Sequence, residues 1–560
     1  MENTSLSSSS ASSSASYREK QIAHVTGLTG SSSIHIACIL LQLPLLTFAL
    51  KILCHRLSTR HSAFFSFWIQ LIGLSIYPVL MVTSPLADQS IWTLLALSAV
   101  CYLLWILAGR CAGNTDADVD LDYSVSNSSS SSSSSSSPTL TFITYFRACS
   151  TLITVACILA VDFKVFPREL AKTEWFGVSL MDLGTGIFIF SSALTSSHAR
   201  AGISVSSPST NPQASSSTSS SSPQSQLLPI NTFTSPMSSS SSSSLSSSSS
   251  LSASSNKCSS PVAYIMSLSR KSKTKIVILL LGIGRLITLK VLAYQEHVSE
   301  YGVHWNFFVT LFAVWTLADA LRMIIPSDSI RVCISILTQC VCQYYLVIDS
   351  SKADGLNALS TYIFSTERSN FISANKEGIY SLIGYISMYV ITESFSKRNI
   401  FNKCESIVER ERKRSKAMLG LIFISALLYL VSSQYVQVVS RRLMNISFVS
   451  LIFFYCCTTL YTLYLVDVKI PPEGIFRLHF YSLLGDNQLI VFLMANVMTG
   501  IVNMTIQTIY INDRDAIMIL VSYMAVLLLG SHALCNILWS CIKDSQLLVR
   551  LRTPRKQFVK

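Results

Sequence analysis

The chain has 560 residues, of which 50% are hydrophobic and only 13% are charged, and its mean hydropathy is +0.47. A soluble domain carries roughly 25% charged residues, so the composition argues against an ordinary soluble enzyme. It also argues against disorder throughout, because disordered chains contain few apolar residues. The net charge of +13 could indicate nucleic-acid binding, but most Lys and Arg flank apolar segments and the sequence has no nucleic-acid-binding motif. The composition predicts a polytopic protein of the lipid bilayer with no nucleic-acid partner.

Serine-rich tracts interrupt the apolar sequence. Residues 5–16, 124–137 and about 203–259 have almost nothing apolar to bury, so burial cannot offset the entropy cost of ordering them. We therefore expect these tracts to be disordered. The predicted organisation is a Ser-rich N-terminal segment with a short motif over 1–33, a first membrane half over 34–200 with the insert at 124–137, a disordered linker over 201–272, a second membrane half over 273–545 and a basic cytosolic tail over 546–560.

Apolar segments of membrane-spanning length make up most of the remaining chain. A spanning helix needs about 20 apolar residues, because hydrocarbon offers the backbone no hydrogen-bond partners. The sequence therefore predicts an all-α membrane protein with about 13 transmembrane helices. The segment before Ile34 is polar, so the first helix is not expected to be a cleaved signal peptide. The predicted spans begin near Ile34, Phe64, Ile91, Phe142, Phe176, Lys275, Trp305, Ile330, Gly378, Ala417, Asn445, Leu489 and Ala516.

Lys and Arg gather in every second loop between these segments. The strongest contributors are residues 257–275, residues 397–416 and the C-terminal tail. Loops rich in Lys and Arg stay in the cytosol, so we expect a cytosolic C-terminus and a luminal N-terminus. Because this assignment places the two termini on opposite sides of the membrane, it requires an odd number of spans.

A first group of ionisable residues follows the fourth predicted span. Such residues at a membrane are costly unless they are paired or reach water, and they often mark functional sites. Asp162 ends the span, and Pro167 prevents the helix from continuing. The chain can therefore fold back and bring Asp162 and Lys172 together. The pair indicates either a catalytic site or a plain interfacial ion pair.

A second group surrounds the end of the sixth predicted span. Arg285 and Lys290 interrupt its apolar sequence, and a run rich in acids, imidazoles and aromatics follows. These side chains indicate either substrate binding or polar residues at a membrane interface. Asn503 belongs to a set of amides in the twelfth predicted span. These amides could bind substrate, or they could form hydrogen bonds between helices. The candidate substrate-binding residues of the run are Gln295, Glu296, His297, Glu300, His304, Trp305 and Asn306.

The cysteines do not indicate a metal site. Most of the 15 lie inside apolar segments, as small buried hydrophobic residues do. Cys340 and Cys342 are too closely spaced for a usual zinc pair, and no His lies at ligand spacing. We expect no bound metal and no cofactor.

Five stretches together resemble one known family. They are HVTGLTGSS at 24–32, AVDFKVFPRELAKTEWFGVSLMDLGTGIFIF at 160–190, GIGRLITLKVLAYQEHVSEYGVHWNFF at 282–308, NKEGIYSLIGY at 375–385 and FLMANVMTGIVN at 492–503. The chain resembles the inositol acyltransferase family of GPI-anchor biosynthesis, the PIG-W type. The resemblance implies a multi-pass protein of the endoplasmic reticulum membrane. It also implies transfer of a fatty acyl group from acyl-CoA, such as palmitoyl-CoA, to the inositol 2-hydroxyl of glucosaminyl-phosphatidylinositol.

The same resemblance implies which residues are catalytic. The Asp and Lys that the family uses for the chemistry correspond to Asp162 and Lys172. Two departures are visible: Glu169 stands where a second Arg is common, and an acidic residue usually found near His35 is absent. The first departure makes any anion-binding role of this loop depend more on Arg168.

The proposed chemistry gives each residue a possible role. An alcohol is a poor nucleophile, so Asp162 would act as general base. Lys172 would either keep that carboxylate charged or stabilise the oxyanion or the departing thiolate, and the sequence leaves both open. Arg168, Arg285 and Lys290 could bind the anionic head groups, while His304, Trp305 and Asn306 could bind sugar or inositol hydroxyls.

Two other functions fit part of the sequence. Many spans with buried charges are also typical of a lipid transporter or scramblase, although no internal repeat is found. An acyltransferase that uses His297 or His304 as its base on another acceptor is the second alternative.

Overall fold

The structure is a computed structural model that describes residues 17, 19–20, 23–24, 26–58, 63–84, 86–110, 140–200, 261–291, 298–348, 358–402, 406–469 and 478–552. The three Ser tracts lie outside the described residues, as do Gln295, Glu296 and His297. Every regular element of the described part is helical, which confirms the all-α prediction.

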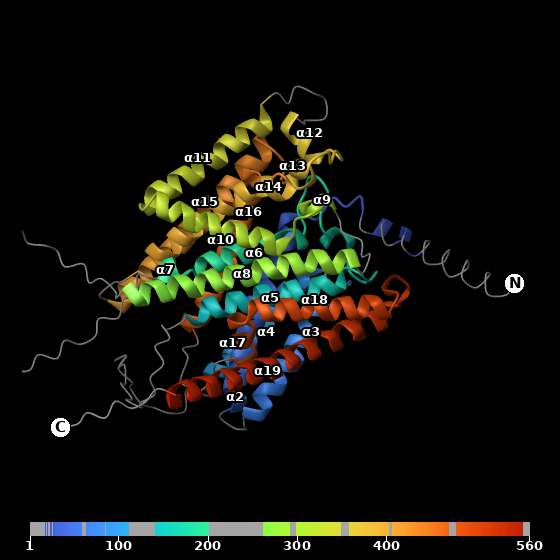
Figure 1. Ribbon diagram of the computed structural model, residues 1–560. Coiled ribbons are helices and arrows are strands. Elements are labelled where there is room, and N and C mark those ends of the chain that lie inside the picture. Colours follow the sequence, from blue (N-terminus) through green and yellow to red (C-terminus); the bar gives the residue numbers. More distant parts are fainter. Residues whose placement is uncertain are drawn as a thin grey trace, which may run out of the picture. The chain divides into compact units, whose positions relative to one another are not determined.

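Figure 1 shows the arrangement of the helices, which follow one another along the chain from α2 to α19 in the described residues. The long ones are α2 (Ser33–Ser58), α3 (Ala63–Val82), α4 (Ser90–Arg110), α5 (Thr141–Ala160), α8 (Pro261–Val291), α10 (Phe307–Ile324), α11 (Asp328–Val347), α14 (Lys376–Phe395), α15 (Ile407–Tyr435), α16 (Ile446–Lys469), α18 (Gln488–Thr505) and α19 (Asp513–Arg552). The shorter ones are α6 (Gly184–Leu194), α7 (Ser197–Arg200), α9 (Val298–Tyr301), α12 (Ala358–Phe364), α13 (Phe371–Ala374) and α17 (His479–Asp486).

Ten helices within the described residues are long and apolar enough to cross a membrane: α2, α3, α4, α5, α10, α11, α15, α16, α18 and α19. Each matches a predicted span, so the protein is a multi-pass membrane protein. Helices α8 and α14 match two further predicted spans in position, but α14 carries Lys376, Glu377 and Glu393. The count of thirteen and the orientation of the two termini stay predictions.

The predicted span that begins near Phe176 is wrong. Residues 176–180 form an irregular loop, a 3-10 turn follows over Met181–Leu183, and only Gly184–Leu194 is an α-helix. A helix of this length rises about 16 Å, roughly half of the hydrocarbon thickness. The apolar side chains that suggested a span, such as Phe188 and Phe190, are buried against the protein.

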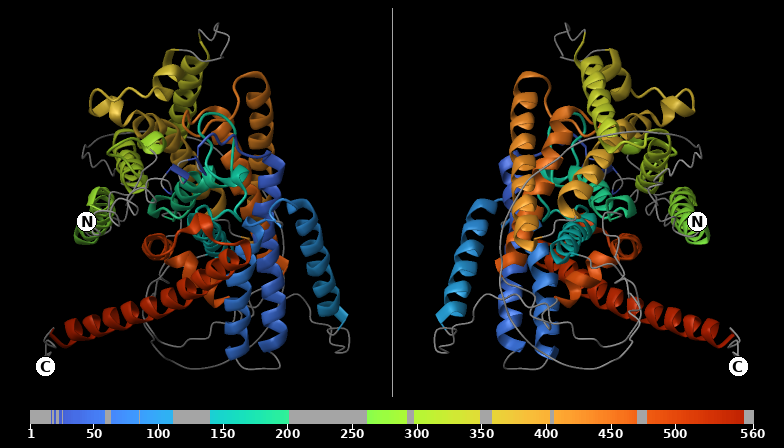
Figure 2. Two further views of the ribbon diagram at one scale, coloured as in Figure 1. Left: turned by 90° about the vertical axis from the view of Figure 1, so that its right-hand side faces the viewer. Right: turned by 90° about the vertical axis from the view of Figure 1, so that its left-hand side faces the viewer.

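Helix α5 is the centre of the helical core. It packs against α3, α6, α16, α17 and α18, and 83% of its span is buried, whereas α4 at the periphery is only 11% buried. Figure 2 shows the teal segment of residues 140–200 between the blue N-terminal helices and the green and yellow helices. The loop that leaves the end of α5 is therefore anchored to the most buried of the candidate spans.

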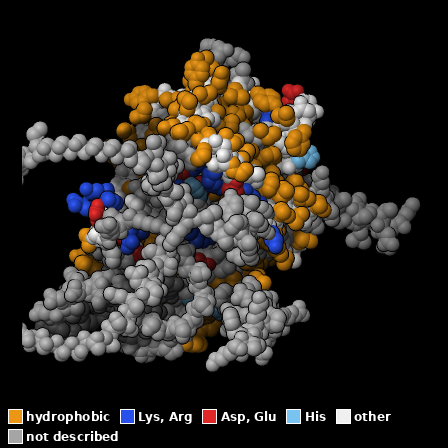
Figure 3. All heavy atoms as spheres, turned by 60° about the vertical axis from the view of Figure 1, so that its left-hand side comes forward, with side chains coloured by type: hydrophobic (Ala, Val, Ile, Leu, Met, Phe, Trp, Pro, Cys, Tyr) orange, Lys and Arg blue, Asp and Glu red, His pale blue; other side chains and the backbone are white. Residues whose placement is uncertain are grey.

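The outer faces of the helices are apolar. Large exposed hydrophobic side chains include Ile336 and Leu337 on α11 and Phe423 and Leu427 on α15. Hydrophobic side chains cover much of the upper part of the face shown in Figure 3. Apolar surface of this extent fits contact with lipid, since soluble monomers rarely expose it.

Candidate active site

The loop after α5 is folded around one guanidinium group. Nε of Arg168 donates to the carbonyl of Phe166 at 3.2 Å, and Nη1 donates to the carbonyl of His24 at 3.2 Å. Nη2 donates to the carbonyls of Val161 and Phe163, both at 3.1 Å. Arg168 therefore joins the loop to itself and to the N-terminal segment, and its donors are occupied by backbone oxygens rather than directed to an open head-group site.

Asp162 lies where α5 ends, with its carboxylate near a cation and an amide. Its Oδ2 accepts a hydrogen bond of 2.8 Å from Nδ2 of Asn503 in α18. Burial raises the pKa of Asp162 to about 6, while the hydrogen bond from Asn503 and the charge of Arg168 act in the opposite direction. The carboxylate is thus largely charged at neutral pH and is a stronger base than an exposed aspartate.

Lys172 has a different partner. Its ammonium forms an ion pair with Oε1 of Glu300, which lies in the short helix α9. Burial alone would raise the pKa of Glu300, but the charges of Lys172 and Arg441 outweigh it and hold this pKa at about 2. Asp162 and Lys172 lie on the same loop but do not form an ion pair with each other, and the cation that acts on Asp162 is Arg168. The expectation that folding back would pair the two is not met.

A buried carboxylate fixes the backbone next to Lys172. Oδ2 of Asp182 accepts from the hydroxyl of Thr173 at 2.8 Å and from the backbone N–H of Ser179 at 2.9 Å. Nε of Arg441 donates to Oδ1 of Asp182 at 2.8 Å. The carboxylate is fully enclosed, so it stabilises the loop and is not placed to meet a substrate.

The N-terminal motif packs against this loop through two glycines. The backbone N–H of Ser31 donates to the carbonyl of Val178 at 2.8 Å. Gly30 and Gly177 have φ of 84° and 104°, and a Cβ on them would meet the carbonyl oxygens of Val178 and Thr29 at 2.3 and 2.1 Å. A side chain fits at neither position, so the glycines allow the two backbones to touch.

Glu169 and His35, the two places where the sequence departs from the family pattern, lie next to each other in the structure. Nδ1 of His35, in the first turn of α2, lies 3.1 Å from Oε1 of Glu169. Its Nε2 lies 2.7 Å from the carbonyl oxygen of Ala87. Glu169 thus supplies the acidic neighbour of His35 that the sequence near His35 lacks.

The residues predicted to bind hydroxyl groups mostly have partners in the protein. Nε1 of Trp305 donates to the hydroxyl of Thr310 at 2.9 Å. Asn306 is the N-cap of α10, and its Nδ2 donates to the carbonyl of Gly282 in α8 at 2.9 Å. The imidazole of His304 is exposed and lies beside the ring of Phe371. Asn306 has a structural role, which its position just before an apolar helix could have indicated.

The other predicted cations lie in α8. Arg285 is close enough to Glu300 for its charge to lower the pKa of that carboxyl. The side chain of Lys290 lies outside the described residues.

The sequence analysis did not identify Arg441 as a site residue. Arg441 belongs to a basic pair in a loop on the side of the membrane that was predicted to be poor in Lys and Arg, and this unusual position could have drawn attention to it.

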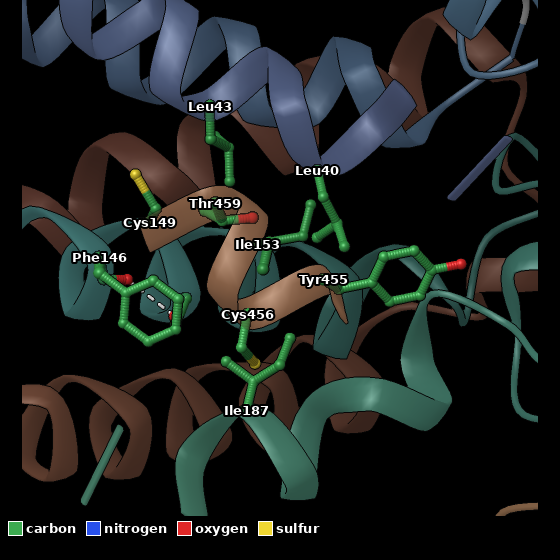
Figure 4. Close-up of a pocket in the computed structure, with 10 residues that line it drawn as sticks. Leu40, Leu43, Phe146, Cys149, Ile153, Ile187, Tyr455, Cys456 and Thr459 are labelled. Carbon is green, nitrogen blue, oxygen red and sulfur yellow. Dashed lines mark hydrogen bonds between the residues drawn. The ribbon is translucent and has the colours of Figure 1, made fainter. Parts of the chain in front are cut away.

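A small apolar cavity lies deeper among the helices (Figure 4). Ile153, its lining residue nearest to Asp162 along the chain, lies about two turns before the end of α5 at Ala160, at 3.6 residues per turn. The lining contains no Lys or Arg for an anionic head group and no residue of the loop after α5, so the cavity is separate from the polar site. Its walls are Leu40, Leu43, Phe146, Cys149, Ser150, Ile153, Ile187, Tyr455, Cys456 and Thr459.

Comparison with known proteins identifies the family. The GWT1 family model matches residues 17–231 and 239–534, which is most of the chain. The chain belongs to the GWT1 family. The resemblance seen in the motifs is thereby confirmed, because the relatives of the chain include a PIG-W protein.

Three relatives show how far the similarity extends. The "phosphatidylinositol-glycan biosynthesis class W protein" of Dictyostelium discoideum is 38% identical over 392 residues, which cover 68% of this chain and 71% of the relative. "GPI-anchored wall transfer protein 1" of Candida glabrata is 31% identical over 423 residues, covering 70% and 74%. The protein of the same name from Debaryomyces hansenii is 31% identical over 413 residues, covering 69% and 72%.

Proposed function

We propose that this GWT1-family protein is an acyltransferase of GPI-anchor biosynthesis in the endoplasmic reticulum membrane. It transfers a fatty acyl group from acyl-CoA to the inositol 2-hydroxyl of glucosaminyl-phosphatidylinositol. The names of the relatives, which refer to GPI anchors and phosphatidylinositol-glycan biosynthesis, support the pathway. The main support for this reaction is the position of Asp162. Its carboxylate is largely buried and is oriented by a hydrogen bond from Asn503.

Asp162 acts as the general base. Because Asn503 occupies Oδ2, Oδ1 is left to accept the proton of the inositol hydroxyl. The hydroxyl oxygen attacks the thioester carbonyl carbon as its proton moves to Asp162, and a tetrahedral oxyanion forms. When the oxyanion collapses, the C–S bond breaks, and the CoA thiolate leaves and recovers the proton from Asp162. No acyl-enzyme intermediate and no cofactor is required.

Lys172 stabilises negative charge that develops during the reaction. It is not the counter-charge of Asp162, because that cation is Arg168 and Lys172 is paired with Glu300. An ammonium has three donors, and the ion pair uses one of them. The side chain is 39% exposed, so the other donors can reach the thioester oxyanion or the leaving thiolate.

The fold suits substrates that have both a lipid tail and an anionic head. Their tails can lie along the apolar outer faces of the helices, while the polar loops hold the reacting groups. Substrates enter from the bilayer and meet at the end of α5, where the core helix presents Asp162.

The test is a transfer assay with purified protein in detergent. Radiolabelled palmitoyl-CoA and glucosaminyl-phosphatidylinositol are mixed with the protein, and label in the lipid is measured. We expect label transfer that Asp162→Asn abolishes and that His304→Ala preserves. Absence of transfer combined with lipid movement between the leaflets of reconstituted vesicles would support a scramblase instead.

A further inference from the structure

We infer that Glu300 is a positioning residue that holds the ammonium of Lys172 in place for the reaction. The inference rests on the proposed acyl transfer and goes beyond it. It also replaces the substrate-binding role that the sequence predicted for Glu300 with an action through Lys172.

The ion pair joins distant parts of the chain. Lys172 belongs to the loop after α5, whereas Glu300 lies in α9, 128 residues later. The Glu300 side chain is 19% exposed and that of Lys172 is 39% exposed, so the carboxylate is the more buried partner. A free lysine samples many rotamers, and its ammonium would be at the right place only part of the time. A buried carboxylate of fixed position removes that freedom.

The backbone of the lysine is fixed as well. Asp182 binds both the backbone N–H and the hydroxyl of Thr173, the residue that follows Lys172. Arg441 donates to Asp182, and its charge also acts on Glu300. Arg441 is therefore paired with the carboxylate that fixes the backbone beside Lys172, and its charge also favours the ionised form of the carboxylate that binds the ammonium.

The turn that carries Glu300 is itself anchored. The hydroxyl of Tyr301 lies 2.6 Å from the hydroxyl of Thr185 in α6. The backbone N–H of Val303 donates to the carbonyl of Ala374 at 2.9 Å. The segment that carries Glu300 is thus attached on one side to α6 and on the other to the last residue of α13.

These contacts make Glu300 different from a carboxylate that only stabilises the fold. Lys172 keeps part of its surface exposed while one of its donors is fixed, which is the arrangement that an oxyanion needs. Preorganised donors of this kind lose their effect when they are displaced by a small distance. Loss of Glu300 should therefore impair turnover more than substrate binding.

The experiment measures acyl transfer by the full-length protein in detergent with Glu300→Gln. We expect kcat to fall about 10- to 100-fold because the donor is displaced, with KM for glucosaminyl-phosphatidylinositol nearly unchanged. Glu367→Gln, which changes an exposed carboxylate, is the control and should match the wild type.

A charge-exchanged variant separates positioning from stability. Lys172→Glu combined with Glu300→Lys restores an ion pair with its polarity reversed. We expect this variant to recover the thermal stability of the wild type but not its activity. Recovery of activity in the exchanged variant, full activity of Glu300→Gln, or a raised KM with unchanged kcat would each overturn the inference. If the wild type itself transfers no acyl group, the proposed function fails, and the inference fails with it.

Discussion

At the scale of single residues, the proposed role of Asp162 as general base depends on the surroundings of its carboxylate. Burial weakens its acidity, and Asn503 and Arg168 limit the effect, so the carboxyl has a pKa of about 6. A base with this pKa is charged at neutral pH and still attracts a proton in the transition state. Two measurable consequences follow from this balance.

The first is an acid limb in the pH–activity profile near pH 6. Asn503→Leu should move this limb to higher pH, because the charged carboxylate loses a hydrogen-bond donor. Asn496→Leu is a matched control, since this amide of α18 donates to the carbonyl of Phe492 instead. The measurement is kcat/KM of the purified enzyme from pH 4.5 to pH 8, and an unshifted limb in Asn503→Leu would argue against Asp162 as the base.

The second consequence concerns stability. Because folding raises the pKa of Asp162 from 3.8 to about 6, the stability that its protonated form contributes is present at low pH and is lost as the pH rises through about 6. Asp162→Asn removes the unfavourable charge, so at pH 7.5 its melting temperature should equal or exceed that of the wild type. Activity should nevertheless fall about 10²- to 10⁴-fold. A lower melting temperature at pH 7.5 would show that the carboxylate is needed for folding.

At the scale of elements, the loop after α5 is held in place by two features, the buried carboxylate of Asp182 and the glycine contact with the N-terminal motif. Both hold the loop against segments that are remote in sequence, 439–445 and 26–32. The position of Lys172 therefore depends on interactions far from the loop.

Asp182→Ala should destabilise the protein strongly. It leaves Arg441 buried without its main partner and removes an acceptor from Thr173, and breaking a buried pair costs about 3–5 kcal/mol. Glu409→Gln is the control, because its pair with Lys413 is exposed and such pairs contribute roughly 0–1 kcal/mol. Thermal unfolding in detergent measures both variants, and equal melting temperatures would contradict the structural role of Asp182.

Gly177→Ala should also destabilise the protein and lower its activity. Its φ of 104° is strained for alanine, and the Cβ would lie 2.1 Å from the carbonyl oxygen of Thr29. Gly420→Ala in α15 provides the contrast, because its Cβ would meet nothing within 4 Å and alanine favours a helix by about 1 kcal/mol. Similar effects of the two substitutions on the melting temperature would argue against the backbone contact.

Local sequence patterns predicted some of these features and not others. Hydropathy located the ten spanning helices, since each contains enough apolar residues to span the bilayer. It failed at 176–194, because apolar residues buried against protein and apolar residues facing lipid look alike in sequence. Asn503 lies 341 residues from Asp162, and Glu300 lies 128 residues from Lys172, so spacing along the loop could not reveal these partners.

At the scale of the whole molecule, the polar site occupies one end of the helices. Segments 28–31, 161–183, 298–306 and 439–445 contact one another there. The positive-inside rule predicts that this end is luminal, because the opposite loops carry more Lys and Arg.

The orientation can be tested in sealed microsomes. An epitope at the C-terminus should be removed by added protease, and an epitope at the N-terminus should be protected until detergent is added. A protected C-terminal epitope would contradict the orientation and would place the site on the cytosolic side.

The most direct measurement of the central claim is acyl transfer by purified wild type and Asp162→Asn under identical conditions, with palmitoyl-CoA and glucosaminyl-phosphatidylinositol as substrates. Mass spectrometry of the lipid product shows whether it has gained one acyl chain on the inositol. We predict that the wild type adds this chain and that the variant, although folded, does not. A wild type that adds no chain, or a variant that adds it at the same rate, would contradict the account.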